Sequence, residues 1–240
     1  MATTTYNIDV KQLLESGAHF GHKTSRWHPK MAEYIHSKRD GSHIIDLTKT
    51  VVSLQAALAF LETIASNNKQ ILLVSTKKQA KEIINKLAQE TNMPFVSERW
   101  LGGMLTNSNT INGRIKHLKD LEAKLASGEL NNKYNKLEVQ RFTEEITELN
   151  RIYGGIKELN GRPGAIFILD INHDKNAVLE ANKIGIKTVG IVDTNTDPTK
   201  ITYPIPANDD AIKTLTLIAD LVKQAINNGK SIASKKVDTK

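Results

Sequence analysis

Residues 99–107, Arg-Trp-Leu-Gly-Gly-Met-Leu-Thr-Asn, place a cation, an indole and two adjacent glycines next to one another. An arginine beside an aromatic ring can hold a phosphate while the ring stacks on a base, and two glycines let the backbone approach a partner closely. No step of covalent catalysis or proton transfer calls for this set of residue types. The segment therefore predicts contact with a nucleic acid rather than an active site.

A second segment, residues 17–30, interleaves cations, aromatic rings and small residues without helical or strand periodicity. A core segment would show a period, and a disordered tail would lack tryptophan and phenylalanine. Such a chain suits contact with phosphates, sugars and unstacked bases, although Phe20 is expected to anchor in the core. The predicted RNA-contacting residues are Lys23, Arg26, Trp27, His28, Lys30, Lys38, Arg39, Lys77, Lys78, Arg99, Trp100, Asn107 and Arg114.

The charge of the chain is gathered in patches. The formal net charge is +7; residues 69–86 hold five lysines against one acid, and residues 229–240 hold four lysines against one acid. Residues 110–160, by contrast, carry nine basic and eight acidic side chains. Patches of basic charge favour a polyanionic partner, although a solvated surface can have the same composition.

The histidines leave metal binding open. Five of the seven lie within the first 43 residues, and none has the spacing of an HExxH or Cys-His zinc motif. A histidine of residues 19–22, with His19 as the candidate, could meet Asp193 and Asp209 and hold a divalent ion such as zinc or magnesium. Alternatively, these histidines contact RNA or pack as ordinary polar residues.

Apolar runs and amphipathic segments alternate along the chain in the manner of βα units. This alternation predicts an α/β fold, a parallel sheet with helices on both faces, and the prolines of its last strand favour an edge position. The expected strands are residues 43–47, 71–74, 94–96, 165–169, 189–192 and 201–205, and the expected helices are residues 50–67, 77–89 and 209–226.

Residues 110–153 interrupt this alternation. Apolar residues recur there at intervals of three and four in two series, separated by Gly128 and a polar stretch over 129–135. The pattern predicts an antiparallel helical hairpin, of coiled-coil type, inserted into the α/β domain. The expected organisation is an α/β domain of residues 1–109 plus 154–228, a hairpin of residues 110–153 and a basic flexible tail of residues 229–240.

An enzyme is the main rival interpretation, because polar loops follow several expected strands, where open parallel sheets bind ligands. The chain has no GxGxxG, P-loop or nucleophile elbow, and the absence of cysteine excludes thiolate nucleophiles, thiolate zinc sites and disulfides. The carboxylates of these loops also serve as helix caps.

The sequence has no secretory or transit signal and no apolar run near 20 residues, so a cytoplasmic protein is expected.

Seven blocks of sequence together resemble the bacterial small-subunit (30S) ribosomal proteins of the S-two family. The resemblance runs in order over residues 17–226, and RWLGGMLTN together with HFGH is its most specific part. The blocks are GAHFGHKTSRWHPKM, HIIDLTKT, ILLVSTKK, RWLGGMLTN, GGIKEL, VDTNTDP and IPANDDAI.

The resemblance implies a structural protein of the cytoplasmic ribosome rather than an enzyme. It implies a flavodoxin-like or Rossmann-like α/β domain with a protruding hairpin, lying on the solvent side of the small subunit where head meets body. The expected partners are small-subunit ribosomal RNA, neighbouring small-subunit proteins and the S-one protein, which would dock here, with no membrane and no small-molecule substrate. A surface receptor, suggested by eukaryotic relatives, is a further alternative, against which the missing secretory signal argues.

Overall fold

The central sheet is built from short apolar runs. Its strands, in spatial order, are β5 (Phe95–Val96), β4 (Ile71–Val74), β6 (Ala165–Ile168), β7 (Lys187–Val192) and β8 (Tyr203–Pro206), and all neighbours pair in parallel. Every residue of β4 and β6 is buried, as expected for strands covered on both faces. The computed structural model, which describes residues 6–237, confirms the predicted α/β fold, and β8 with its prolines is an edge strand.

Helices cover one face of this sheet more fully than the other. α1 (Val10–Ser16), α2 (Leu47–Ser66), α3 (Lys81–Thr91) and α8 (Ile212–Val237) pack around Phe167 and its neighbours on the first face. On the second face, α7 (Lys175–Lys183), the loop of residues 99–107 and the base of the hairpin enclose a separate core. The second core therefore joins the hairpin to the sheet.

α2 is the one helix of the described residues whose length and apolar composition would suffice to cross a membrane. In this fold it is a core helix, because it packs against α8 and β8 with Leu54, Leu58 and Leu61 fully buried.

The C-terminal helix α8 differs from expectation. It continues to Val237, so residues 229–237 of the predicted flexible tail are helical, and residues 238–240 lie outside the described residues. Within this extension, Gly229 lets α8 cross α2 closely, since a Cβ there would lie 2.6 Å from Ala65 Cβ.

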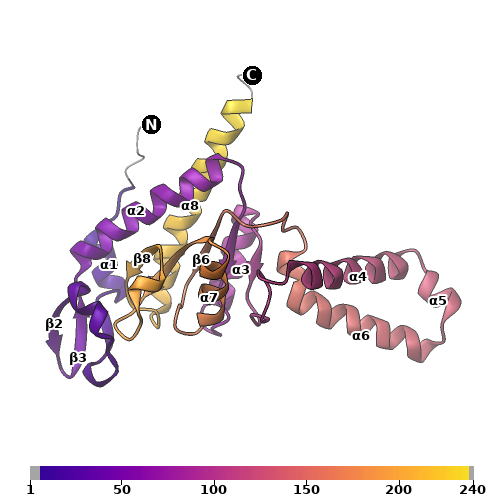
Figure 1. Cartoon of the computed structure of the whole chain (residues 1–240), viewed down its shortest axis with the longest axis horizontal. Helices are drawn as coiled ribbons and strands as arrows, with labels where there is room; N and C mark the ends of the chain where they lie inside the picture. The colour runs from indigo at the N-terminus through magenta and orange to yellow at the C-terminus, as the bar shows by residue number, and fades with distance from the viewer. Residues whose placement is uncertain (1–5, 238–240) are drawn as a thin grey trace.

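The segment of residues 43–47 does not join the parallel sheet as predicted. β3 (Ser42–Ile45) is the middle strand of a separate antiparallel sheet, between β1 (Phe20–Lys23) and β2 (Ile35–Arg39). Asp40 and Gly41 have φ values of 50° and 75°, the backbone of a tight two-residue hairpin turn, and this turn pairs the segment with β2. The antiparallel sheet lies at one end of the molecule (Figure 1).

The helical hairpin extends from the other end (Figure 1). α4 (Ser108–Ala126) and α6 (Lys136–Tyr153) form its two arms, and Asn135 and Glu138 start α6 with a reciprocal capping box. The short helix α5 (Glu129–Lys133) occupies the stretch that was expected to be a polar loop. Leu118, Leu121 and Ile146 are buried along the seam, so the arms satisfy each other's apolar stripes.

Candidate nucleic-acid interface

Four exposed cations lie on the antiparallel sheet and on the turn that follows β1: Lys23, Arg26, Lys38 and Arg39. Within the described residues, Lys23, Arg26 and Lys38 make no ion pair, and Arg39 faces only the exposed Asp40, at 3.7 Å. These side chains are held by the short strands and by a 3-10 turn over Thr24–Arg26. They are therefore available to phosphates.

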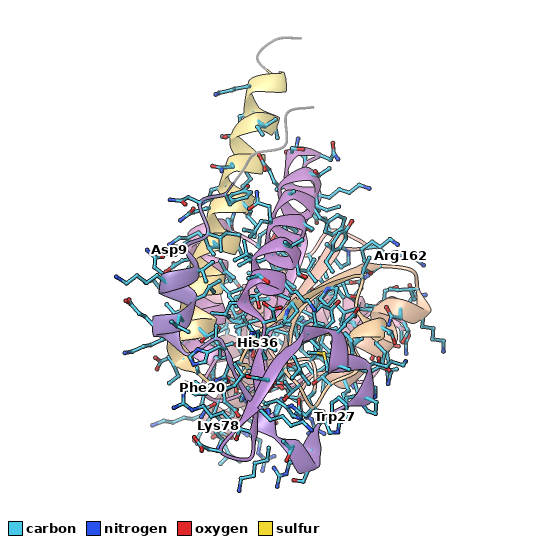
Figure 2. The ribbon with its side chains drawn as sticks, turned by 90° about the vertical axis from the view of Figure 1, so that its left-hand side faces the viewer. Asp9, Phe20, Trp27, His36, Lys78 and Arg162 are labelled. Atoms are coloured by element: carbon cyan, nitrogen blue, oxygen red, sulfur yellow. The ribbon has the colours of Figure 1, made fainter. Side chains whose placement is uncertain are left out.

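Two aromatic side chains accompany these cations. Phe20 is 52% exposed and Trp27 is 38% exposed, and both lie at the end of the molecule that Figure 2 views. The Phe20 ring lies 4.0 Å from the ring of His19, and that of Trp27 lies 5.3 Å from the ring of His43. Phe20 is not the core anchor that was expected, because β1 is an edge strand and leaves the outer face of this ring uncovered. We call Phe20, Lys23, Arg26, Trp27, Lys38 and Arg39 the basic end.

His28 and Lys30 attach the N-terminal segment to the loop after β7. The His28 backbone amide donates to Thr194 O at 2.7 Å, and Lys30 Nζ lies 3.1 Å from Asp197 Oδ2. Burial raises the pKa of Asp197, but hydrogen bonds from Thr199 and Lys30 outweigh this and lower it to about 2. Lys30 is thus committed to an internal ion pair, unlike the other predicted cations of this segment.

Trp100 does not present its face to a partner. It is 8% exposed, and its Nε1 donates to Glu180 Oε1 at 3.1 Å. The backbone amides of Gly103 and Leu105 donate to the two carboxylate oxygens of Glu180 at 2.8 and 3.0 Å. Thr106 adds its amide and hydroxyl, each at 3.2 Å from Oε2.

Glu180 therefore organises the loop of residues 99–107 from the neighbouring helix α7. Burial raises its pKa, but the donors of the loop outweigh burial and lower it below its usual range. Gly103, with φ of 87°, permits the turn that points these amides at one carboxylate. The expectation of a stacking Trp100 is corrected accordingly, whereas Arg99, Asn107 and Arg114 are exposed.

Lys77 is likewise committed within the protein. Its Nζ lies 2.9 Å from Asp170 Oδ2, 2.7 Å from Asp210 Oδ1 and 3.5 Å from Asp209 Oδ1. Burial alone would lower its pKa, but these carboxylates raise it overall. The network fills the carboxyl ends of β4 and β6, the switch point where sheets of this kind bind ligands. Lys78, beside it, is exposed.

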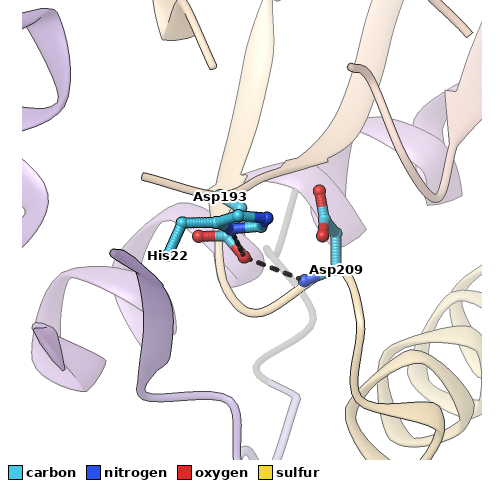
Figure 3. A group of neighbouring side chains, drawn as sticks. All are labelled: His22, Asp193 and Asp209. Carbon is cyan, nitrogen blue, oxygen red and sulfur yellow. Dashed lines mark hydrogen bonds and ion pairs between the residues drawn. The ribbon is translucent and has the colours of Figure 1, made fainter. Parts of the chain in front are cut away.

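His22, Asp193 and Asp209 form a cluster beside this network (Figure 3). Each offers one ligand atom within 4.8 Å of the others, and His22 Nδ1 lies 3.1 Å from Asp193 Oδ2. Burial, with Asp170 and Asp193 nearby, raises the pKa of Asp209 to about 7. The hydrogen bond to Asp193 raises the pKa of His22.

The histidine of this cluster differs from the candidate predicted. The structure brings Asp193 and Asp209 together, but with His22 rather than His19. The His22 backbone amide donates to Thr194 Oγ1 at 2.8 Å, which fixes β1 against the loop after β7. His19 lies outside the cluster, and its ring contacts Phe20.

The family model for ribosomal protein S2 matches residues 13–229. The chain belongs to the ribosomal protein S2 family. It is similar to three proteins called small ribosomal subunit protein uS2: from Roseiflexus castenholzii (49% identity over 93% of this chain and 85% of that protein), Dehalococcoides mccartyi (47%, 91% of each) and Fusobacterium nucleatum (44%, 92% and 90%).

This family is the S-two family that the motifs resemble. A member of the ribosomal protein S2 family is a structural constituent of the small subunit of the cytoplasmic ribosome and not an enzyme.

The sequence indicated the loop of residues 99–107 but not Glu180, because a single glutamate on an amphipathic helix carries no distinguishing signal.

Proposed function

We propose that this chain binds small-subunit ribosomal RNA chiefly through phosphate contacts at the basic end. The observation that carries the proposal is the set of exposed cations there, of which Lys23, Arg26 and Lys38 make no ion pair within the described residues, next to two exposed aromatic rings. Phosphate contacts fix position without reading base sequence, which suits a protein that recognises folded RNA by shape.

Salt titration tests this proposal. Binding of the purified protein to small-subunit RNA should weaken by orders of magnitude between about 50 and 200 mM salt. The double variant Lys38→Gln, Arg39→Gln should bind more weakly and with a salt slope that is shallower by about one for each phosphate that it no longer neutralises. Lys86→Gln, Lys183→Gln removes the same charge from exposed positions on α3 and α7 and should change little. A flat salt response, or an equal effect in both double variants, contradicts the proposal.

We propose further that the S-one protein docks beside the basic end. Val10, Leu14 and Phe20 are large apolar side chains that are each about half exposed, and apolar side chains left on a surface favour a protein partner. Val10→Ser, Leu14→Ser should reduce the S-one protein that sediments with small subunits while leaving RNA binding by the purified protein intact, because both residues lie outside the basic end. Unchanged S-one retention contradicts this part.

A divalent ion at His22, Asp193 and Asp209 is the third part of the proposal. Burial, with Asp170 and Asp193 nearby, raises the pKa of Asp209 to about 7, so this carboxylate gains from a bound cation. An imidazole ligand favours zinc over magnesium. The alternative is that Lys77 alone supplies the positive charge. Elemental analysis should find about one ion per chain, absent from Asp193→Asn and retained in Asp197→Asn. A metal-free chain, both alone and with the S-one protein, would falsify the idea.

A further inference from the structure

A pocket of about 200 Å³ lies next to the basic end, at the carboxyl ends of β6 and β7. Its floor is apolar, since Ile171 and Val178 line it and are 3% and 2% exposed. Leu179 stands at its wall with 56% of its surface exposed. The volume is below the 300–1,000 Å³ or so of pockets for drug-sized ligands, and it suits a single planar ring system.

The rim of the pocket is polar and basic. Lys175 and Lys200 are both exposed, and neither side chain makes an ion pair or hydrogen bond within residues 6–237. The side-chain amide of Asn172 is also free of hydrogen bonds in that range, and the amide nitrogen of Asn195 faces no acceptor there. The acid of the rim, Asp197, is already neutralised by Lys30 at 3.1 Å. The net charge that the rim presents to a ligand is therefore positive.

We propose that this pocket binds one unstacked nucleotide of RNA, a deepening that rests on the proposed function. The base lies on the floor of Ile171 and Val178, and the two asparagine amides reach its polar edge. The phosphates meet Lys175 and Lys200. The imidazole of His28 lies at the rim, where Lys30 N donates to its Nδ1 at 3.3 Å, so it is oriented to stack.

Position and charge favour a nucleotide over an apolar side chain of a neighbouring protein. An apolar side chain would use the floor and Leu179 but leave two lysines and two amides without partners. His28 and Lys30 also belong to the segment that carries the basic end. A single strand bound at the basic end therefore lies close to the pocket.

Methyl NMR of the full chain tests the proposal directly. Titration with uridine monophosphate, and with a mixed-sequence single-stranded tetraribonucleotide, should shift the methyl signals of Ile171, Val178 and Leu179. Lys175→Gln, Lys200→Gln should weaken tetranucleotide binding about tenfold. Lys86→Gln, Lys183→Gln removes the same charge and is the matched control, which should bind as the unaltered chain does; Lys183 lies on the same helix as Lys175, about 12 Å further along its axis. Asn195→Phe, which fills the pocket, should abolish the methyl shifts.

The outcomes separate this inference from the proposed function. Unmoved pocket methyls in a chain that still binds ribosomal RNA with a steep salt slope overturn the nucleotide pocket and leave the basic end standing. The same follows if Asn195→Phe keeps RNA binding unchanged but joins small subunits poorly, because a protein side chain then fills the pocket. Absence of salt-dependent RNA binding in the unaltered chain contradicts the proposed function itself.

Discussion

Glu180 places one carboxylate against donors from four residues of the loop that follows β5. Replacing it by glutamine keeps the shape but turns one acceptor into a donor, so backbone amides of the loop lose their partner. Since a hydrogen bond to a charged group contributes about 1.5–3 kcal/mol, Glu180→Gln should lower the free energy of unfolding by roughly 3 kcal/mol.

Urea denaturation measures this change. Glu148→Gln, which removes only a surface pair with Arg151, is the matched control and should cost under about 1 kcal/mol. Equal stability of the two variants would mean that the loop holds its conformation without Glu180.

The raised pKa of Asp209 predicts that the stability of the folded chain depends on pH. In the folded chain it keeps its proton up to about pH 7, while in the unfolded chain it titrates near the ordinary value of 3.8. Between these values the folded state binds more protons, so stability falls as pH rises from about 4 to 7. His22, with its raised pKa, adds a decrease of the same sign as pH rises above 6.5 through its folded pKa.

Asp209→Asn removes the first contribution, and its stability should fall less steeply over pH 4–7. Unfolding of both chains by urea at several pH values, with a chelator present, provides the comparison. Parallel curves for the variant and the unaltered chain would show that Asp209 titrates normally in the folded state.

At the scale of elements, the exit of the hairpin depends on one glycine. A Cβ at Gly155 would overlap the carbonyl oxygen of Phe95, so only glycine lets the chain after α6 pass against β5. At Gly154 the nearest atom would be Asn150 Oδ1 at 3.6 Å, an ordinary contact.

Gly155→Ala should therefore destabilise the fold by about 1–3 kcal/mol, because the backbone must shift. Gly154→Ala should be neutral or stabilise by up to about 1 kcal/mol, because it has helical φ and ψ and lies at the end of α6. Thermal melting distinguishes the two, and similar melting temperatures would show that the approach of Gly155 to β5 is unimportant.

Across the whole molecule, the basic end and the hairpin lie far apart and differ in charge (Figure 1). Residues 122–145 carry four basic and five acidic side chains, so the distal hairpin adds little long-range attraction to RNA. Leu121 and Ile146, which flank this part, both belong to the core that joins the hairpin to the sheet. Replacing residues 122–145 by a short Gly–Ser linker should leave cooperative melting and the salt slope of RNA binding unchanged.

The shortened chain should nevertheless join small subunits poorly, because shape and local contacts carry the hairpin's role. Sedimentation of reconstituted subunits measures this incorporation. A melting transition that is no longer cooperative would identify the distal hairpin as part of the core, and normal incorporation would show that it is not a docking element.

The sequence alone determined the elements whose signal is local. Two continuous apolar runs, Ile71–Val74 and Ala165–Ile168, predict strands of a sheet that is covered on both faces, because only such a sheet buries every side chain of a strand. The two apolar series of residues 110–153 have the period of paired helices. Asp40-Gly41 is also a local signal, for a tight hairpin, but the prediction did not use it and wrongly placed residues 43–47 in the parallel sheet.

Only the tertiary structure decided which polar side chains meet. Trp100 and Glu180 are 80 residues apart, Lys77 and Asp170 are 93 apart, and His22 meets a loop 172 residues away. The sequence contains the same lysine, tryptophan or histidine whether that side chain faces solvent or an internal carboxylate. Their roles depend on the burial and the charges that chain folding brings around them, and these are set by contacts between distant segments rather than by neighbours in sequence.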